Sequence, residues 1–239
     1  IRVDACGLQC PGPILKMKKT MDSLVSGDRV EITSTDPGFP RDAAAWCNST
    51  GNQLISKEAA GGKSVVVIEK GEPKSCNIVT SCEGKGKTFI MFSDDLDKAL
   101  ATFVLANGAA ATGQKVTIFF TFWGLNVIKK LHKPNVEKDI FGKMFGMMLP
   151  SSSRKLKLSK MSMGGIGGKM MRYIMNRKGI DSLESLRQQA LENGVEFIAC
   201  QMSMDVMGVK QEELLDEVTI GGVATYMERA DNANINLFI

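Results

Sequence analysis

The chain has 239 residues, of which 44% are hydrophobic and 23% charged, so its composition is that of a globular protein rather than a disordered one. The net charge of +4 is unevenly spread: residues 129–178 carry 13 basic and 2 acidic side chains, and residues 179–239 carry 3 and 11. This asymmetry predicts a basic surface that faces an acidic partner or an acidic part of the same molecule. No apolar run approaches the roughly 20 residues of a membrane-spanning helix, so we expect no integral membrane segment. The six cysteines fit a protein of the reducing cytoplasm, which is where we expect it.

The first 70 residues predict a small α/β unit in the order β-α-β-α-β-β. Pro11 and Pro13 mark the start of its first helix. Proline is tolerated there because the first N–H groups of a helix have no acceptor within the helix. Strands and helices follow from alternating and helical apolar patterns bounded by Gly, Pro and Asp. We expect strands at residues 1–5, 29–33, 53–58 and 64–69, and helices at 14–24 and 41–49.

A linker at residues 71–86, rich in Gly, Pro, Ser and Lys, separates this unit from a second one at residues 87–239. In the second unit strands alternate with helices, which predicts a parallel sheet with right-handed crossovers. We expect strands at 88–92, 115–120, 195–199, 218–220 and 236–239, and helices at 96–112, 123–130, 182–193, 211–217 and 221–230. The fold class is therefore α/β, a small two-layer domain followed by a parallel-sheet domain.

Residues 133–170 are too long for an ordinary crossover loop and form an insertion. The segment is rich in methionine, glycine and lysine. Glycines lose backbone entropy when they become ordered, and lysines resist burial. We therefore expect the insertion to be mobile, or to be ordered mainly by contacts with other subunits.

Two cysteines are candidates for chemistry. Six cysteines are too few for a disulfide scaffold, and His132 is the single histidine, so a His-based metal site is not expected. Cys10 precedes a helix, whose partly positive N-terminus favours a thiolate. Cys200 directly follows a strand, and ligands bind at the carboxyl ends of parallel strands. For each of the two, a structural core cysteine is the alternative.

The other cysteines are weaker candidates. Cys6 lies four residues before Cys10, and either acts as a resolving thiol or packs at a strand end. Cys47 lies within the helix expected at residues 41–49, beside Trp46, and we expect it to pack in the core of the first unit. Cys76 and Cys82 lie in the linker with a spacing that fits no common zinc pattern, which leaves a redox role open.

The stretch DACGLQCPGP, from Asp4 to Pro13, resembles the TusA/SirA family of sulfur carriers, and the resemblance covers residues 1–70. It implies that Cys10, the cysteine before Pro-x-Pro, carries a persulfide and passes its outer sulfur to a partner.

Residues 86–239 resemble the DsrE/DsrF/DrsH-like family. The resemblance implies a flavodoxin-like α/β domain with a cysteine that accepts persulfide sulfur, and this role falls on Cys200. Members often form homo-oligomers, so a homo-oligomer is expected here as well. The stretches that carry the resemblance are residues 95–99, 119–126, 199–208 and 221–226.

The two resemblances together imply a cytoplasmic persulfide sulfur-transfer protein that relays sulfane sulfur between Cys10, Cys200 and partner proteins. The expected partners are a sulfurtransferase or other persulfide donor protein and a sulfur acceptor protein, and no metal or organic cofactor is expected. The alternative is a non-catalytic docking or regulatory module of a flavin-dependent disulfide reductase, and the start at Ile1 without Met is consistent with a cut from such a fusion. Nucleic-acid binding is not expected, because the basic stretch lacks interleaved aromatic residues.

Overall fold

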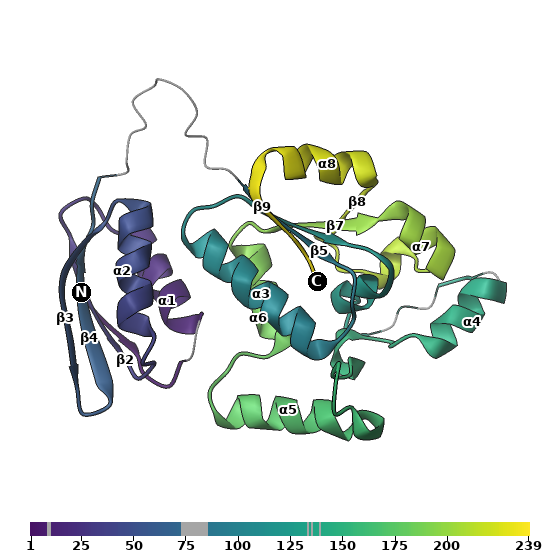
Figure 1. Cartoon of the computed structure of the whole chain (residues 1–239), viewed down its shortest axis with the longest axis horizontal. Coiled ribbons are helices and arrows are strands. Elements are labelled where there is room, and N and C mark those ends of the chain that lie inside the picture. Colours follow the sequence, from purple (N-terminus) through teal and green to yellow (C-terminus); the bar gives the residue numbers. More distant parts are fainter. Residues whose placement is uncertain (9–10, 73–85, 133, 135, 139) are drawn as a thin grey trace.

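The computed structural model of the chain describes residues 1–8, 11–72, 86–132, 134, 136–138 and 140–239. It contains a four-stranded sheet and a five-stranded sheet, each with its own helices (Figure 1). The predicted fold class is confirmed: a small two-layer domain in the order β-α-β-α-β-β precedes a flavodoxin-like domain with a parallel sheet.

The first domain is a sheet of strand order β1-β2-β4-β3, covered on one face by α1 and α2. The strands β1 and β2 are parallel, while β4 runs antiparallel to both β2 and β3. Alternate side chains of β2 and β4 are buried under the two helices, which is the period of two that the sequence predicted. The elements are β1 (Arg2–Ala5), α1 (Gly12–Asp22), β2 (Arg29–Ser34), α2 (Phe39–Thr50), β3 (Gln53–Ala60) and β4 (Lys63–Glu69).

The second domain is a sheet of order β8-β7-β6-β5-β9 in which every pair of neighbours is parallel. Helices α3 and α6 cover one face over a large apolar core, and α8 covers the other face over a smaller cluster (Figure 1). The strands are β5 (Gly86–Met91), β6 (Val116–Phe120), β7 (Glu196–Cys200), β8 (Thr219–Gly221) and β9 (Ala233–Phe238). The helices on the faces are α3 (Leu96–Ala111), α6 (Leu183–Glu192) and α8 (Val223–Asp231).

Two elements at the carboxyl end of this sheet differ from the expectation. The helix expected at 211–217 is a single 3-10 turn, η4 (Gln211–Glu213), because the backbone N–H of Leu215 bonds to the carbonyl of Ile128 instead of continuing the helix. A helix that was not expected, α7 (Gln201–Met207), follows β7 directly. The short helix expected at 123–130 is the 3-10 segment η1 (Phe122–Ile128).

Part of the insertion packs on its own domain, and the expectation that it is mobile, or ordered mainly by contacts with other subunits, stays a prediction. It folds into α4 (Ile140–Met148), the 3-10 turns η2 (Ser153–Lys155) and η3 (Met163–Gly165), and the start of α5 (Ile166–Arg177). Leu156 and Leu158 pack into the main core, and Ser159 Oγ donates to the carboxylate of Asp97. Local composition did not reveal these contacts, because their partners lie far away along the chain.

Several basic side chains of residues 129–178 pair with acidic side chains of residues 179–239. Lys138 Nζ lies 2.6 Å from Glu213 Oε2, and both side chains are nearly fully buried. Arg172 pairs with Glu184 at 3.0 Å. Part of the basic charge of residues 129–178 therefore faces an acidic part of the same molecule, which was one of the two predicted alternatives.

The first domain contacts the second through the ends of α2 and α3. Trp46 Nε1, on α2, donates a hydrogen bond to the carbonyl of Ala111, the last residue of α3, and Ala111 packs into the apolar core of the first domain. A Cβ built on Gly179, between α5 and α6, would lie 2.3 Å from the carbonyl oxygen of Gly7. These contacts join residues far apart in the sequence (Figure 1).

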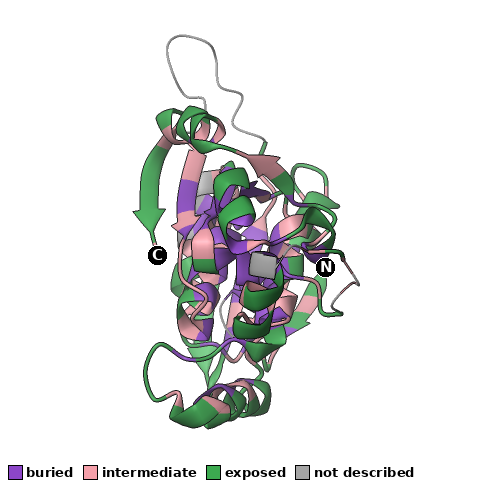
Figure 2. Cartoon of the chain, turned by 90° about the vertical axis from the view of Figure 1, so that its right-hand side faces the viewer, coloured by how far each residue is buried: buried purple, intermediate pink, exposed green. Residues whose placement is uncertain are grey.

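Buried side chains gather on the central strands, whereas β9 and much of α5 are exposed (Figure 2). Across the described ranges, no helix has both the length and the apolar character needed to cross a bilayer.

Candidate functional site

Cys200 lies at the carboxyl end of the parallel sheet. It is the last residue of β7, rather than the residue after the strand, and α7 begins immediately behind it. Its register partner on β8 is Gly221. The loop that follows β6 runs beside it, because β6 and β7 are neighbours whose Phe120 and Ala199 pair. The structure therefore puts the thiol at the sheet edge where α/β proteins hold their ligands.

The thiol of Cys200 is free and sits among apolar side chains on the face that α8 covers. Only 6% of the residue is exposed. It clusters with Phe119, Ile198 and Tyr226, and the rings of Phe119 and Tyr226 have their centroids 5.2 Å apart. The thiol is accordingly largely buried among apolar side chains.

The neighbourhood of Cys200 is packed tightly by two further contacts. Thr121, just after β6, and Ser203, on α7, share a buried hydroxyl–hydroxyl hydrogen bond of 2.7 Å that ties α7 to the sheet. A Cβ on Gly221 would lie 2.8 Å from Ile198 Cγ2, within the cluster that surrounds the thiol. A larger residue at position 221 would therefore displace Ile198, which packs against the thiol.

Cys10 lies outside the described residues, but the structure defines the chain on both sides of it. The helix α1 begins at Gly12, so covalent geometry keeps the Cα of Cys10 within about 7.6 Å of the first helical Cα. The helix starts with free N–H groups and partial positive charge. No acidic side chain in its first turn offsets that charge.

The turn before Cys10 is held by hydrogen bonds from its backbone. The N–H of Cys6 donates to Asp4 Oδ1 and the N–H of Gly7 donates to Thr35 Oγ1, both at 2.8 Å. Gly7 has a φ of +80°, a left-handed conformation that suits glycine. Lys16 Nζ donates to the carbonyl of Asp4 at 2.7 Å. Asp4, Cys6 and Gly7 belong to the motif at residues 4–13, whereas Thr35 and Lys16 lie outside it, and nothing local in the sequence marks Thr35.

The remaining cysteines differ in character. The hydrogen bond from the Cys6 thiol to Asp4, with burial and the charge of Asp4 adding to it, raises the pKa of Cys6 and disfavours the thiolate that a resolving cysteine needs. Burial raises the pKa of Cys47 to about 11, and its side chain lies in the core, so the expectation that it packs is confirmed. Cys76 and Cys82 lie outside the described residues.

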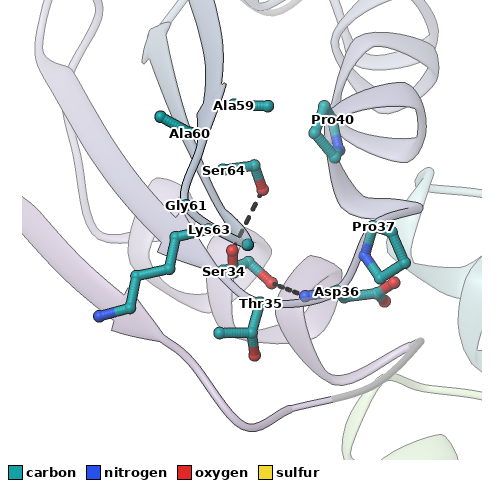
Figure 3. A pocket seen from close by; sticks show the side chains of 11 residues that line it. Ser34, Thr35, Asp36, Pro37, Pro40, Ala59, Ala60, Gly61, Lys63 and Ser64 are labelled. Carbon is teal, nitrogen blue, oxygen red and sulfur yellow. Dashed lines mark hydrogen bonds between the residues drawn. The ribbon is translucent and has the colours of Figure 1, made fainter.

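A hollow of about 300 Å³ lies beside this turn (Figure 3). It is bounded by the end of β2 with the following Asp36 and by the β3–β4 turn with Lys63. Thr35 lines the hollow and accepts the hydrogen bond from the N–H of Gly7. The positive charge of Lys63, at the other side of the hollow, acts to lower the pKa of both Asp4 and Cys6. The hollow therefore adjoins the turn that leads to Cys10 and is remote from Cys200. Among the described residues, no group of three His, Cys, Asp or Glu side chains is placed to hold a metal ion.

Comparison with known proteins relates each domain to a family. Residues 84–238 match the model described as the DsrE/DsrF/DrsH-like family, and residues 1–70 match the model described as sulfurtransferase TusA. Over 155 residues the chain is 44% identical to the uncharacterized protein YrkE of Bacillus subtilis, a match that covers 65% of this chain and 97% of YrkE.

Two further relatives come from Allochromatium vinosum. The sulfur carrier protein DsrE2 is 38% identical over 161 residues, which is 66% of this chain and 99% of DsrE2. The sulfur carrier protein TusA is 43% identical over 68 residues, which is 28% of this chain and 90% of TusA. The two relatives thus correspond to different parts of this chain.

Proposed function

Because the chain belongs to the DsrE/DsrF/DrsH-like family and also carries a TusA-type sulfur carrier domain, we propose that it relays sulfane sulfur between Cys10, Cys200 and partner proteins. The observation that carries the proposal is the setting of Cys200, a free thiol at the carboxyl edge of the sheet in an apolar cluster. The partners in this proposal are a persulfide donor protein and a sulfur acceptor protein.

Cys10 is the carrier that meets other proteins. It immediately precedes Pro11 and lies two residues before α1, whose N-terminal N–H groups and partial charge stabilise a thiolate or a persulfide anion. The turn before it is held by Asp4 and Thr35, which limits the backbone freedom lost when a partner binds.

Transfer between the two thiols needs no oxidant and no reductant. The Cys200 thiolate attacks the outer sulfur of the Cys10 persulfide, and a new S–S bond forms as the old one breaks. The electron pair of the old bond leaves on the Cys10 sulfur, which becomes a thiolate, and the proton stays on the transferred sulfur. The reverse reaction is equally balanced, so the partners decide the direction.

Cys200 is the buried sulfur acceptor in this relay. An exposed persulfide is lost to reductants and oxidants, and the Phe119, Ile198 and Tyr226 side chains surround the thiol with apolar surface. In this proposal Cys10 is the carrier and the buried Cys200 is the acceptor.

The test is to incubate the full chain with inorganic polysulfide and to measure, by mass spectrometry of its peptides, which cysteines gain a sulfur atom. We expect gain on Cys10 and Cys200, loss of each gain in Cys10→Ser and Cys200→Ser respectively, and no effect of Cys47→Ser on either. If neither Cys10 nor Cys200 gains sulfur, the relay is wrong and the docking module of a disulfide reductase takes its place.

A further inference from the structure

We propose that the hydroxyl of Thr121 donates a hydrogen bond to the outer sulfur of a persulfide on Cys200, and that Ser203 holds Thr121 in place for it. This inference rests on the proposed relay and adds the group that stabilises negative charge on the accepted sulfur. It follows from a buried hydroxyl proton that the described residues leave without an acceptor.

Thr121 lies beside Cys200 on the same face of the sheet. The strands β6 and β7 pair in parallel register up to Phe120 and Ala199. Thr121 continues β6 with an extended backbone, φ −132° and ψ 150°, and Cys200 is the next residue of β7. The two residues are therefore neighbours on strands that lie about 4.8 Å apart. Alternation along β6 puts Thr121 on the face of Phe119, where the Cys200 thiol also lies.

The hydroxyls of Thr121 and Ser203 have one proton more than their shared hydrogen bond uses. Their Oγ atoms lie 2.7 Å apart, and one hydroxyl donates to the other. Each hydroxyl has one proton, so a second proton remains, and no described residue accepts it. Ser203 is fully buried and Thr121 is 9% exposed, so the pair has little access to water. A buried donor is thus left over beside the thiol.

Tyr226, the polar member of the cluster around the thiol, does not compete for this role. Its Oη lies 3.2 Å from Thr88 Oγ1. Thr88 gives its own proton to Asn236 Oδ1, so the hydroxyl of Tyr226 must donate to Thr88. The Tyr226 proton is therefore engaged, whereas one proton of the Thr121–Ser203 pair is not.

A charged sulfur on Cys200 needs such a donor. The anion of a persulfide carries its charge on the outer sulfur, and the side chains of Phe119 and Ile198 surround the site with apolar surface. A buried charge is strongly unfavourable unless it is hydrogen-bonded. Neither hydroxyl of the pair bonds to the uncharged thiol in the structure, but the outer sulfur of a persulfide lies one S–S bond, about 2 Å, further out. The accepted sulfur, rather than the thiol, is therefore the atom that the pair serves.

The charged groups on the elements around the thiol are placed elsewhere. Glu196, at the start of β7, pairs with Arg229 of α8 at 2.9 Å, which puts both at the other end of the strand. Asp205 on α7 and Glu228 and Asp231 on α8 are exposed, so solvent screens their charges. Removal of one hydroxyl beside the sulfur should therefore dominate its response to pH.

The experiment measures the ionisation of the persulfide on the full-length chain. The protein is loaded with inorganic polysulfide, freed of the reagent and trapped with iodoacetamide at a series of pH values, and mass spectrometry of the Cys200 peptide measures the trapped persulfide. Thr121→Val keeps the shape of the side chain but removes the hydroxyl. We expect it to raise the pH of half-maximal trapping rate by about one unit, because the anion loses its donor. Thr121→Ser, which keeps the hydroxyl, should behave like the parent.

Two further variants separate donation from packing. Ser203→Ala breaks the same bond between the hydroxyls as Thr121→Val but leaves the proton of Thr121, so its shift should be clearly smaller. Thr117→Val removes a hydroxyl from the same face of β6 at its other end, where it bonds to Glu196, and should cause no shift. Cooperative urea unfolding checks that each variant folds, and Thr121→Ala takes the place of Thr121→Val if the latter does not.

The outcomes separate this inference from the relay itself. No shift in Thr121→Val, or equal shifts in Thr121→Val and Ser203→Ala, would overturn donation by Thr121 and leave the relay intact. Absence of added sulfur on the Cys200 peptide of the parent chain would overturn both.

Discussion

At the scale of single residues, the carboxylate of Asp4 organises the turn that leads to Cys10. It accepts hydrogen bonds from the N–H and the thiol of Cys6, and these bonds lower its own pKa while they raise the pKa of Cys6. Cys6 is thereby kept as a thiol. Cys10 comes two residues before α1 in the sequence, and we expect the start of that helix to favour its thiolate.

Asp4→Asn should make Cys6 more reactive. The variant removes the negative charge and the strong acceptor, so the pKa of Cys6 falls toward its ordinary value of 9.0 and more thiolate is present at any pH below that value. The measurement is the pH profile of iodoacetamide alkylation of the Cys6 peptide. Asp22→Asn, which removes an exposed carboxylate of α1 paired with Lys18, is the control and should leave the profile unchanged. An unaltered profile in Asp4→Asn would show that Asp4 does not set this pKa.

At the scale of elements, the insertion shows how polar contacts fix a segment of glycine-rich and lysine-rich composition. Glu184, at the start of α6, accepts from Arg172 on α5 and from the hydroxyl of Ser153. Arg172 also donates to the carbonyl of Ser153. One carboxylate thus joins α6, α5 and the turn η2, whose residues lie apart in the sequence.

The stability of the second domain should depend on the ionisation of Glu184. Burial opposes ionisation, but the charge of Arg172 and the hydrogen bonds outweigh it and hold the pKa of Glu184 below its ordinary value of 4.5. Because the folded-state pKa is the lower one, this stabilisation is complete above the ordinary value and is lost as the pH falls through the folded-state pKa. Glu184→Gln should lower the free energy of unfolding by about 1–3 kcal/mol near neutral pH.

Urea unfolding at a series of pH values checks this expectation. The difference between the parent and Glu184→Gln should shrink as the pH drops below 4.5. Glu228→Gln, which removes a largely exposed partner of Arg229, should cost less than about 1 kcal/mol at every pH. A difference in Glu184→Gln that stays constant with pH would mean that the charge of Glu184 contributes nothing.

At the scale of the whole molecule, the two domains share part of a core. Ala111 belongs to the second domain by sequence and to the apolar cluster of the first by packing, and Trp46 bonds to its carbonyl. The environment of Trp46 therefore depends on α3 being folded. The carrier domain is in this sense a docked part of a larger unit rather than a freely swinging arm.

Leu186→Ala should report this coupling. Leu186 is buried on α6, and its truncation should lower the free energy of unfolding of the second domain by about 2–5 kcal/mol. In a Trp123→Phe background, the emission of Trp46 should change at the same urea concentration at which circular dichroism reports unfolding of the second domain. If Trp46 emission in Leu186→Ala does not follow that transition, the docking contact is absent in solution.

The sequence by itself determined the two sheets, the order of their strands along the chain and the place of Cys200 at the carboxyl end of a strand. The alternating pattern of Arg29–Ser34 and the pattern of Val116–Phe120, which is apolar apart from Thr117, are local properties. Burial on one face imposes a period of two on a strand, whereas burial on both faces removes it. Pro11 and Pro13 likewise mark the start of α1 without any distant contact.

Tertiary structure alone decided the rest, because it depends on residues that are distant in sequence. The helix expected at 211–217 gave way to a backbone bond with Ile128, the insertion was ordered by partners such as Glu213 and Asp97, and Thr35 came to hold the turn before Cys10. The docking of Trp46 on Ala111 is of the same kind. No local pattern in the sequence encodes which apolar surface of one domain packs against which surface of the other.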